Sequence, residues 1–396
     1  MRLLIFRKLK ATKIFTFLYT TLWMLLEYPS IASGANYNQL AIVMCLIGFL
    51  WYVTSYKNKF YHLIQGVIFF LVFFSKQTVG VYYAFGVVLF EFLEYGFSKK
   101  FFKNQFTKLA TFLPCVLIFL VVMYFEGNLL DFIDLCFGSI FEFAGSNTSF
   151  FVKNLTYVIA MVVILVFSIF VLKKQKNIDS DFSRNIKFGI CLALPLSLNM
   201  YPIMNAYHIT MGLLFYYIVF VYIIDKTLLS ELFSTQSELR IFVVILVILL
   251  LSFGIRAGHY YITHYRNLEH FDKENPFYIA GISKENLQRC NKIIHYIKEK
   301  EENGINVLVL SHEAAGFMVP LNHNNREFDM LLLGNLGYNG VQKTIEKISK
   351  MQNTEFLIFT DEEDCFVQHP KEIRNYIISN FEEIDTILNY TIYSTN

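Results

Sequence analysis

The sequence predicts a polytopic α-helical membrane protein that carries a small α/β domain at its C-terminal end. Hydrophobic residues make up 55% of the 396 residues, charged residues only 17%, and the mean hydropathy is +0.43. This composition excludes an ordinary soluble enzyme. Charged residues are sparse before about position 256 and dense after it, so we expect a multispan domain at 1–256 and an α/β domain at 257–396.

Apolar segments separated by short polar ones predict about nine membrane spans. The first segment follows five basic residues, and no small-residue cleavage site closes it, so a cleaved signal peptide is the weaker interpretation. The predicted spans lie at 14–26, 40–56, 64–74, 79–92, 109–125, 157–172, 188–200, 209–224 and 241–255.

The basic residues of the polar loops predict how these spans are oriented, because cytoplasmic loops carry an excess of Lys and Arg. With the N-terminus inside, every strongly basic loop falls inside. The turn at Lys76, the acidic loop at 126–147, the turn at 201–208 and everything after Arg256 then fall outside. We therefore expect a multi-pass protein of the cell membrane whose C-terminal domain is extracytoplasmic. The basic inner loops are 57–59, 99–108, 173–187 and 226–240.

The C-terminal part alternates helical and strand-like patterns. Helical spacing of apolar residues at 284–302, 337–351 and 370–381 alternates with short apolar runs at 307–310, 356–359 and 386–393. Strands that alternate with helices predict a parallel sheet of about three strands. No phosphate-binding glycine motif or nucleophile elbow accompanies them, and the six cysteines show no metal-like spacing. The net charge of +2 gives no reason to expect a nucleic-acid partner.

Lys76 interrupts an apolar segment that runs from residue 64 to residue 92. As one helix this segment would exceed the roughly 17–25 residues that cross a bilayer and would hold Lys76 at mid-depth. An ammonium group there costs about 2.5–3.5 kcal/mol. Two short spans that turn at residues 75–78 bring Lys76 to a membrane face instead. At that face the lysine is either a solvated interfacial residue or part of a binding site.

The outer turn at 201–208 lies on the same predicted face as Lys76. Lys76 can bind a lipid phosphate as a point charge, and His208 can donate a hydrogen bond to it. The alternative is an interfacial histidine that only forms hydrogen bonds. Further substrate-binding candidates are the neutral polar residues Gln77, Tyr201, Asn205 and Tyr207.

Acidic residues on the outer face are the candidates for a general base, which glycosyl or acyl transfer to a hydroxyl group needs. Asp131 and Asp134 are the nearest, and Glu27 in the first outer loop is a third. The alternative for Asp131 and Asp134 is a solvated loop surface that maintains the charge difference across the membrane.

Three short motifs carry a resemblance to a known family. The run Ser75-Lys76-Gln77-Thr78-Val79-Gly80 resembles the KQT-G turn of bacterial GT-C-class glycosyltransferases, which use polyprenyl-phosphate sugars and are related to protein mannosyltransferases and aminoarabinose transferases. Tyr201-Pro202 with His208 resembles their P-R-x-D-x-x-H turn, and Tyr37-Asn38 also fits their pattern. The resemblance implies a polyprenyl-phosphate-sugar donor whose phosphate contacts Lys76 and His208, and a glycan, lipid or protein acceptor. Some members use a divalent metal, although no ligand cluster in this sequence requires one.

The chain departs from the family pattern in two places. Ile203 and Asn205 stand where the family has Arg and Asp. Residues 1–60 resemble the family's later spans, and its acidic first outer loop has no counterpart beyond Glu27, so we expect an N-terminally truncated member. We favour a hexosyl or pentosyl transferase of the cell envelope over a non-catalytic lipid-binding relative. A transporter of lipid-linked sugar would need repeated halves and charges at mid-membrane.

Overall fold

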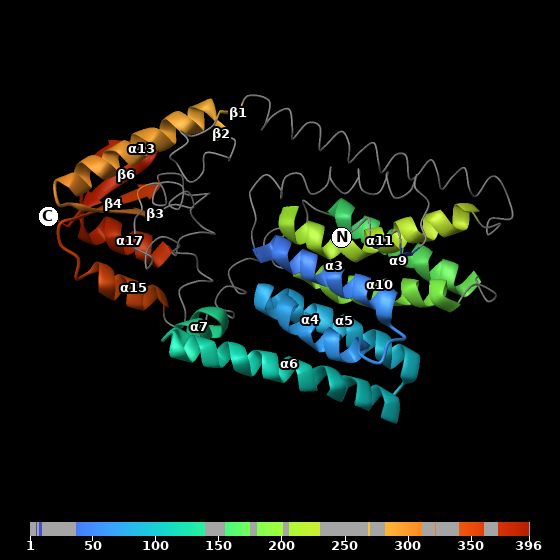
Figure 1. Ribbon diagram of the computed structural model, residues 1–396. Helices are drawn as coiled ribbons and strands as arrows, with labels where there is room; N and C mark the ends of the chain where they lie inside the picture. The colour runs from blue at the N-terminus through green and yellow to red at the C-terminus, as the bar shows by residue number, and fades with distance from the viewer. Residues whose placement is uncertain are drawn as a thin grey trace. The chain divides into compact units, whose positions relative to one another are not determined.

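A computed structural model describes residues 5, 8–9, 37–138, 155–174, 180–200, 206–229, 268–269, 282–310, 321, 340–359 and 371–395. Of these, 78% are helical, and a small sheet accompanies the helices. The chain divides into two compact units, Met1–Val122 with Thr148–Tyr260 and Met123–Asn147 with Tyr261–Asn396 (Figure 1). The spans predicted at 14–26 and 241–255 lie outside the described residues.

The first unit is a bundle of helices that fall on the other predicted spans. By length and composition, two of the described helices, Gln77–Tyr95 and Lys99–Phe125, can cross a membrane, which indicates membrane association. Shorter apolar helices lie at Leu40–Ser55, Tyr61–Ser75, Met161–Lys173 and Gly212–Ile223. In chain order the helices are α3 (Tyr37–Ser55), α4 (Tyr61–Ser75), α5 (Gln77–Tyr95), α6 (Lys99–Phe125), α9 (Leu155–Lys174), α10 (Ser180–Ser197) with the 3₁₀ turn η3 (Leu198–Met200), and α11 (Ala206–Leu229).

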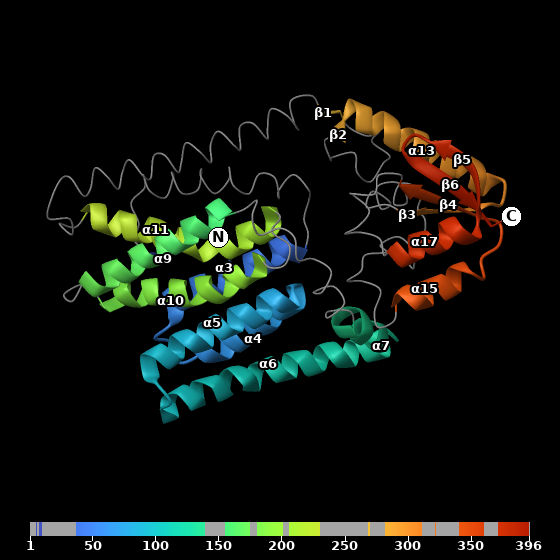
Figure 2. The same ribbon diagram turned by 180° about the vertical axis from the view of Figure 1, so that it is seen from behind.

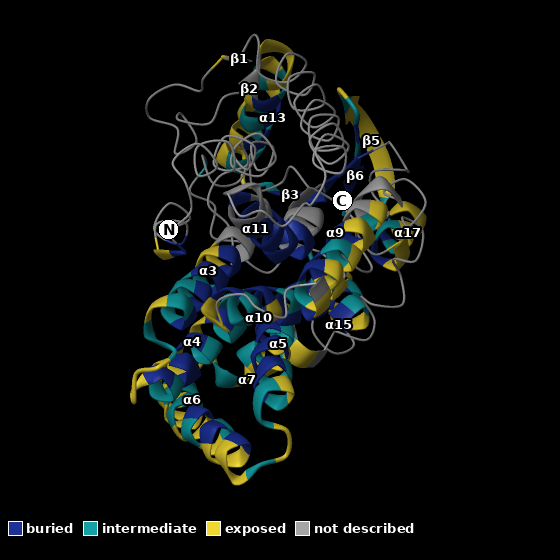
Figure 3. Ribbon diagram, turned by 90° about the vertical axis from the view of Figure 1, so that its right-hand side faces the viewer, coloured by how far each residue is buried: buried dark blue, intermediate teal, exposed yellow. Residues whose placement is uncertain are grey.

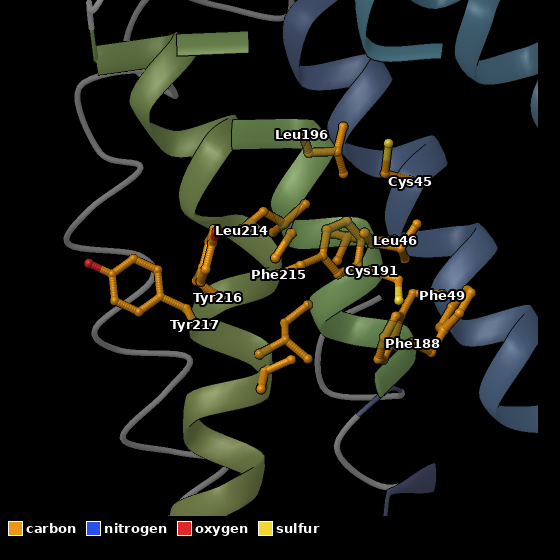
Figure 4. Packing of buried hydrophobic residues seen from close by; sticks show 14 of the residues in the cluster. Cys45, Leu46, Phe49, Phe188, Cys191, Leu196, Leu214, Phe215, Tyr216 and Tyr217 are labelled. Atoms are coloured by element: carbon orange, nitrogen blue, oxygen red, sulfur yellow. The ribbon is translucent and has the colours of Figure 1, made fainter. Parts of the chain in front are cut away.

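Aromatic side chains fill the core of this bundle where α3, α10 and α11 meet. The ring of Phe49 on α3 lies 5.6 Å from that of Phe188 on α10 and 5.4 Å from that of Phe215 on α11, measured between centroids (Figure 4). Tyr52, one turn further along α3, stacks on Phe188 at 3.6 Å. All four side chains are buried, so they contribute both apolar area and ring-to-ring contacts.

Gly86 lets α5 and α10 approach closely. A Cβ at this position would lie 2.5 Å from the backbone oxygen of Cys191, which is closer than real Cβ atoms come. Small residues at helix crossings allow backbones to come together in membrane proteins, where lipid gives no hydrophobic drive for association. Gly86 is therefore a packing residue of the bundle.

Gly86→Ala is expected to lower the free energy of unfolding by about 1–3 kcal/mol, because the added methyl group must push the two helices apart. The measurement is the thermal unfolding midpoint of the full chain in detergent micelles, followed by helical circular dichroism. Ala110→Val, on the exposed side of α6, is the matched control and should leave the midpoint nearly unchanged. Equal midpoints for Gly86→Ala and the parent protein would show that the contact is not tight.

The turn at Lys76 confirms the predicted hairpin. Helix α4 ends at Ser75 and α5 begins at Gln77, with Lys76 between them in an extended conformation (φ −159°, ψ 113°). The two helices fold back on each other, as a hydrogen bond between them shows: Gln65 Nε2 on α4 donates to Tyr83 Oη on α5 at 2.8 Å. A Cβ on Gly80 would lie 2.3 Å from the backbone of Phe73, so a larger residue there would separate the helices near the turn.

Helix α6 begins about ten residues earlier than the span predicted at 109–125. The segment 99–108 was predicted to be a basic loop, but it forms the first turns of α6, which begins at Lys99. Lysine is a good helix former, and the segment contains no Gly or Pro that would prevent a helix. Within α6, all of which is described, the buried residues are Phe101, Asn104 and Lys108, a narrow stripe at helical spacing; the rest of the helix is more exposed (Figure 3).

The second unit contains a four-stranded sheet with helices on both faces (Figures 1 and 2). Helix α13 packs on one face of the sheet, and α15 and α17 pack on the other. The elements are α7 (Leu129–Ile133), a π-helical turn η1 (Asp134–Gly138), β1 (Leu268–Glu269), β2 (Ile282–Ser283), α13 (Lys284–Glu302), β3 (Asn306–Leu310), α15 (Gly340–Ile348), β4 (Thr354–Phe359), α17 (Lys371–Asn380), β5 (Glu382–Ile387) and β6 (Tyr390–Ser394).

The sheet order is β3-β4-β6-β5, and only β3 and β4 are parallel. Strand β6 runs antiparallel to both β4 and β5, so the prediction of a wholly parallel sheet of about three strands is wrong. The run predicted as one strand at 386–393 is a hairpin that turns at Leu388-Asn389. Leu388 adopts a positive φ of 55°, a turn conformation that its side chain does not signal in the sequence.

Alternate residues of the strands serve the two layers of this unit. Val307 and Val309 of β3 pack toward α13, while Leu308 and Leu310 pack toward α15 and α17. This follows from the two-residue period of a strand, whose side chains point to opposite faces in turn. Because both faces are covered, β3 and β4 consist of nearly continuous buried residues.

Candidate functional site

The first feature of the candidate site is an apolar groove bounded by α4, α5 and α6. Its volume is about 720 Å³, within the range of about 300–1,000 Å³ typical of small-molecule sites. Gly80, Ala84 and Val88 line it from α5 at four-residue spacing, and Phe69 and Phe73 line it from α4. The groove therefore follows one stripe of α5 for about two turns.

The groove starts one helical turn from Lys76. The backbone amide of Gly80 donates a hydrogen bond to the carbonyl oxygen of Lys76 at 2.9 Å, and Phe73 precedes Lys76 by three residues. Lys76 is itself partly buried, and Gln77 is the first residue of α5. Two of the residues predicted to bind substrate, Lys76 and Gln77, thus lie within one helical turn of the groove, although neither is among its lining residues.

Helix α6 forms the other wall of the groove and is held to α4 by a close contact. Thr111 Oγ1 donates to the backbone oxygen of Leu63 at 2.8 Å. A Cβ on Gly66 would lie 2.2 Å from the backbone oxygen of Lys108. The wall itself is largely apolar, and Leu109 and Phe112 project into it. The position of the groove therefore depends on the α4–α6 contact as well as on the hairpin.

The second feature is a buried charged cluster, two of whose members, Gln105 and Lys108, also line the groove. Glu91 and Lys108 are 0% and 1% exposed, and their charged atoms lie 2.7 Å apart (Lys108 Nζ to Glu91 Oε2). Gln105 bridges the pair: its Nε2 donates to Glu91 Oε2 at 2.8 Å, and its Oε1 accepts from Lys108 Nζ at 3.0 Å. His62 Nδ1 lies 3.5 Å from the other carboxylate oxygen of Glu91.

The four members of this cluster come from the three helices that bound the groove. Glu91 follows Val88 by three residues on α5. Gln105 and Lys108 come from α6 and are the polar members of the lining, and His62 comes from the first turn of α4. Electrostatically the Glu91–Lys108 pair is close to neutral, because the two opposite charges lie 2.7 Å apart.

A second, more exposed set of charges lies one turn beyond Glu91. Glu94 lies 3.3 Å from Lys187 Nζ and 3.8 Å from Arg184 Nε, both on α10. Arg184 also lies over the ring of Tyr56, whose hydroxyl group forms a short hydrogen bond with that of Tyr95. These contacts join the ends of α3, α5 and α10, and their solvent exposure makes them weaker than the Glu91 cluster.

The remaining predicted site residues are distributed over the chain. Asp131 lies in α7 and Asp134 in η1, both in the second unit, and Asp134 Oδ2 lies 3.5 Å from Lys343 Nζ on α15. Tyr207 and His208 lie in the first turn of α11. Glu27, Tyr201 and Asn205 lie outside the described residues. Asp134 is thus engaged in an ion pair, whereas Lys76 and Gln77 adjoin the groove.

The cluster was missed at the sequence level, although the sequence contains a signal for it. Glu91 stands between Phe90 and Phe92 in a segment predicted to span the membrane. A carboxylate in such a segment requires a partner and is by default a candidate for function. The signal was obscured because Lys108 was assigned to a loop and Glu91 to the end of a span.

No metal site joins these features in the part of the chain that the structure describes, where no three His, Cys, Asp or Glu side chains gather. The chain has no match among protein-family models, curated proteins or solved structures. What the site can do chemically is set by its parts: a lysine one helical turn from the groove, apolar walls suited to a hydrocarbon chain, and a neutralised polar cluster that contributes Gln105 and Lys108 to the lining.

Proposed function

We propose that the protein is a membrane glycosyltransferase that transfers a sugar from a polyprenyl-phosphate donor to an extracytoplasmic glycan, lipid or protein. The observation that carries the proposal is the apolar groove that begins beside Lys76. A polyprenyl phosphate has one anionic group and a long apolar chain, so a lysine one helical turn from an apolar groove matches its chemistry.

The proposal assigns the phosphate to Lys76 and not to Lys108, because Lys108 is buried and bound to Glu91 and Gln105. Lys76 lies between two helices at the tip of the hairpin, where the predicted topology places it at the outer membrane face. In this proposal the donor phosphate contacts Lys76, and its hydrocarbon chain extends along Ala84 and Val88.

The topology required is that of about nine spans with the N-terminus inside and the C-terminal α/β domain outside. The apolar helices of the first unit support it, and the hairpin at Lys76 is one of its specific requirements. Transfer also needs a general base for the acceptor hydroxyl. Asp131 and Asp134 are the candidates among the described residues, and Asp131 is the more exposed of the two.

Lys76→Met is expected to reduce transfer of radiolabelled sugar from a polyprenyl-phosphate donor by about 10- to 100-fold, which corresponds to the loss of one charge-assisted contact. His208→Ala should also reduce it. Membranes containing each full-length variant are assayed at equal protein level. Lys59→Met removes another partly solvated lysine near a hairpin helix and should retain parent activity. Equal transfer by all four proteins would remove Lys76 and His208 from the proposal.

A transporter of lipid-linked sugar is the second candidate, and the buried Glu91–Lys108 pair with His62 favours it, since ionisable groups inside a membrane domain often mark ion or proton pathways. Flipping of a fluorescent polyprenyl-phosphate sugar across proteoliposomes distinguishes the two. Movement without transfer identifies a transporter, and lipid binding with neither activity identifies a non-catalytic lipid-binding protein.

A further inference from the structure

The corner between α5 and α6 combines lysines with exposed aromatic rings. Lys99, Lys100 and Lys103 lie in the first turns of α6, and all three are exposed. Phe97 and Phe102 lie among them and are 76% and 58% exposed. We call these five residues the basic corner. In a helix that crosses a membrane, such a mixture is typical of the level of the lipid headgroups, where aromatic rings gather and lysines extend toward phosphate.

Local contacts hold the basic corner in one shape. Ser98 precedes α6, and its side-chain oxygen accepts a hydrogen bond from the amide of Phe101 at 3.3 Å. Its carbonyl oxygen accepts another from the amide of Phe102 at 3.2 Å. The ring of Phe97 lies 4.7 Å from that of Phe92 on α5 and 6.3 Å from that of Phe102, measured between centroids. The surface is therefore ordered before a ligand arrives, which lowers the entropy cost of binding.

Contacts within the protein do not account for the lysines of the basic corner. The two carboxylates of α5 that are nearest in the sequence, Glu91 and Glu94, are already bound by basic residues of α6 and α10. Within the described part of the chain, none of the three lysines forms an ion pair, and Lys100 Nζ lies 4.2 Å from the centroid of the Tyr95 ring. Cations in the first turn of a helix oppose its dipole, so these lysines do not stabilise α6.

The position of the lysines along α6 indicates where an anion would meet them. Helix α6 is one of the two described helices that can cross a membrane by length and composition, and it contains no acidic residue. All of its lysines lie within its first ten residues, and the rest of the helix is uncharged. The charged end of such a helix lies at a membrane surface, and the predicted topology assigns it to the inner one.

We propose that the basic corner binds the headgroup of an anionic phospholipid of the inner leaflet. Its lysines contact the phosphate oxygens as point charges, and the rings of Phe97 and Phe102 lie at the boundary between headgroups and acyl chains. Charge complementarity selects this occupant, because anionic lipids give the inner surface a negative potential and a zwitterionic lipid carries no net charge. The inference does not depend on sugar transfer, since the basic corner does not include Lys76.

The test is the binding of phospholipids to the purified full chain in detergent micelles, measured by native mass spectrometry. Phosphatidylglycerol and phosphatidylcholine with identical acyl chains are compared, so that they differ only in their headgroups. The parent protein should bind phosphatidylglycerol more tightly. Lys99→Gln/Lys100→Gln/Lys103→Gln should lower its affinity for phosphatidylglycerol by on the order of 100-fold, about fivefold for each lysine, and should leave its affinity for phosphatidylcholine unchanged.

Lys284→Gln/Lys292→Gln/Lys298→Gln is the matched control. It removes three exposed lysines of α13 in the second unit, and therefore the same net charge, and it should bind phosphatidylglycerol as the parent does. Glutamine forms helices about as well as lysine, so both triple variants should keep the helical circular dichroism and thermal midpoint of the parent. Inorganic phosphate has no acyl chains, and an equal concentration of it should not displace the lipid.

Equal binding of the two lipids by the parent protein would overturn the proposal without any variant. An equal loss of affinity in the two triple variants would also overturn it, because the lysines would then act only through the net charge of the protein. Displacement of phosphatidylglycerol by inorganic phosphate would identify a site for free anions instead. A failure to detect sugar transfer would contradict the proposed function and would leave this inference unchanged.

Discussion

Glu91→Leu is expected to lower the free energy of unfolding of the full chain by about 3–5 kcal/mol, the usual consequence of removing one partner of a buried ion pair. The substitution leaves Lys108, which is 1% exposed, without the carboxylate that lies 2.7 Å from its ammonium group. Gln105 cannot replace this partner, because its amide carries no charge. The ammonium group must then be deprotonated or α6 must move away from α4.

Glu91→Leu/Lys108→Leu separates the effect of an unpaired charge from the effect of lost packing. It should recover most of the stability, since apolar residues of similar volume often replace a buried ion pair without loss. Glu94→Leu, whose partners Arg184 and Lys187 are partly exposed, should cost no more than about 1 kcal/mol.

These variants are compared by the thermal unfolding midpoint in detergent micelles and by amide hydrogen exchange along α6. Faster exchange at the first turns of α6 in Glu91→Leu, and not in the double variant, would identify the movement of α6 as the cause. A single variant as stable as the parent protein would mean that Lys108 finds water or another partner, and the description of the cluster as a buried pair would be wrong.

The hairpin and the helices of the C-terminal unit could be predicted because their signals are local. Lys76 stands alone between two apolar runs, and both the cost of burying it and the span length favour a turn. The helix predicted at 284–302 is α13 with the same bounds, since apolar residues at helical spacing precede a Gly304 with φ of 77°.

Other features depend on partners that are distant in the sequence. In the sequence Lys108 resembles the other basic residues of the predicted loop. Only the tertiary structure shows that it pairs with Glu91, seventeen residues earlier. Strands β5 and β6 were merged because the turn at Leu388-Asn389 contains neither Gly nor Pro. The groove could not be predicted at all, because its walls come from three helices whose relative packing is a tertiary property.

The residues of the candidate site show the same difference between local signals and distant partners. Lys76 and Gln77 were predicted from a local break in hydropathy, and the structure places them beside the groove. Asp134 was predicted from its charge alone, and the structure pairs it with Lys343, more than two hundred residues later. A carboxylate in a loop carries no local signal that distinguishes a catalytic base from a member of an ion pair.

Glu355→Leu is expected to lower the free energy of unfolding of the second unit by about 2 kcal/mol, because the hydrogen bonds to a buried charged group are lost. Glu355 is the second residue of β4 and is 3% exposed. It accepts a hydrogen bond from Tyr296 Oη at 2.5 Å and from Lys300 Nζ at 2.7 Å, and both donors lie on α13. The carboxylate therefore fastens α13 to the sheet, and exchange of α13 amides should become roughly thirtyfold faster without it.

The same contact predicts a loss of stability at alkaline pH. Burial, and then the hydrogen bond to the Glu355 carboxylate, raise the pKa of Tyr296 above its ordinary value of 10.0. Below about pH 10 the phenol is protonated in both the folded and the unfolded chain, so it contributes no pH dependence. Above that pH the unfolded chain loses the proton first, and the stability of the folded state falls as pH rises toward the higher folded pKa.

Tyr296→Phe removes the titrating group and keeps the ring, so the parent protein should lose more stability than this variant between about pH 8 and about pH 11. Pulse proteolysis of the full chain in urea, with an alkali-tolerant protease and detection of the C-terminal fragment, gives the unfolding midpoint at each pH. Tyr376→Phe, a tyrosine of α17 that packs against Phe381, is the control and should behave as the parent does. If Tyr296→Phe and Tyr376→Phe lose equal stability across this range, the Tyr296–Glu355 hydrogen bond does not govern the alkaline response.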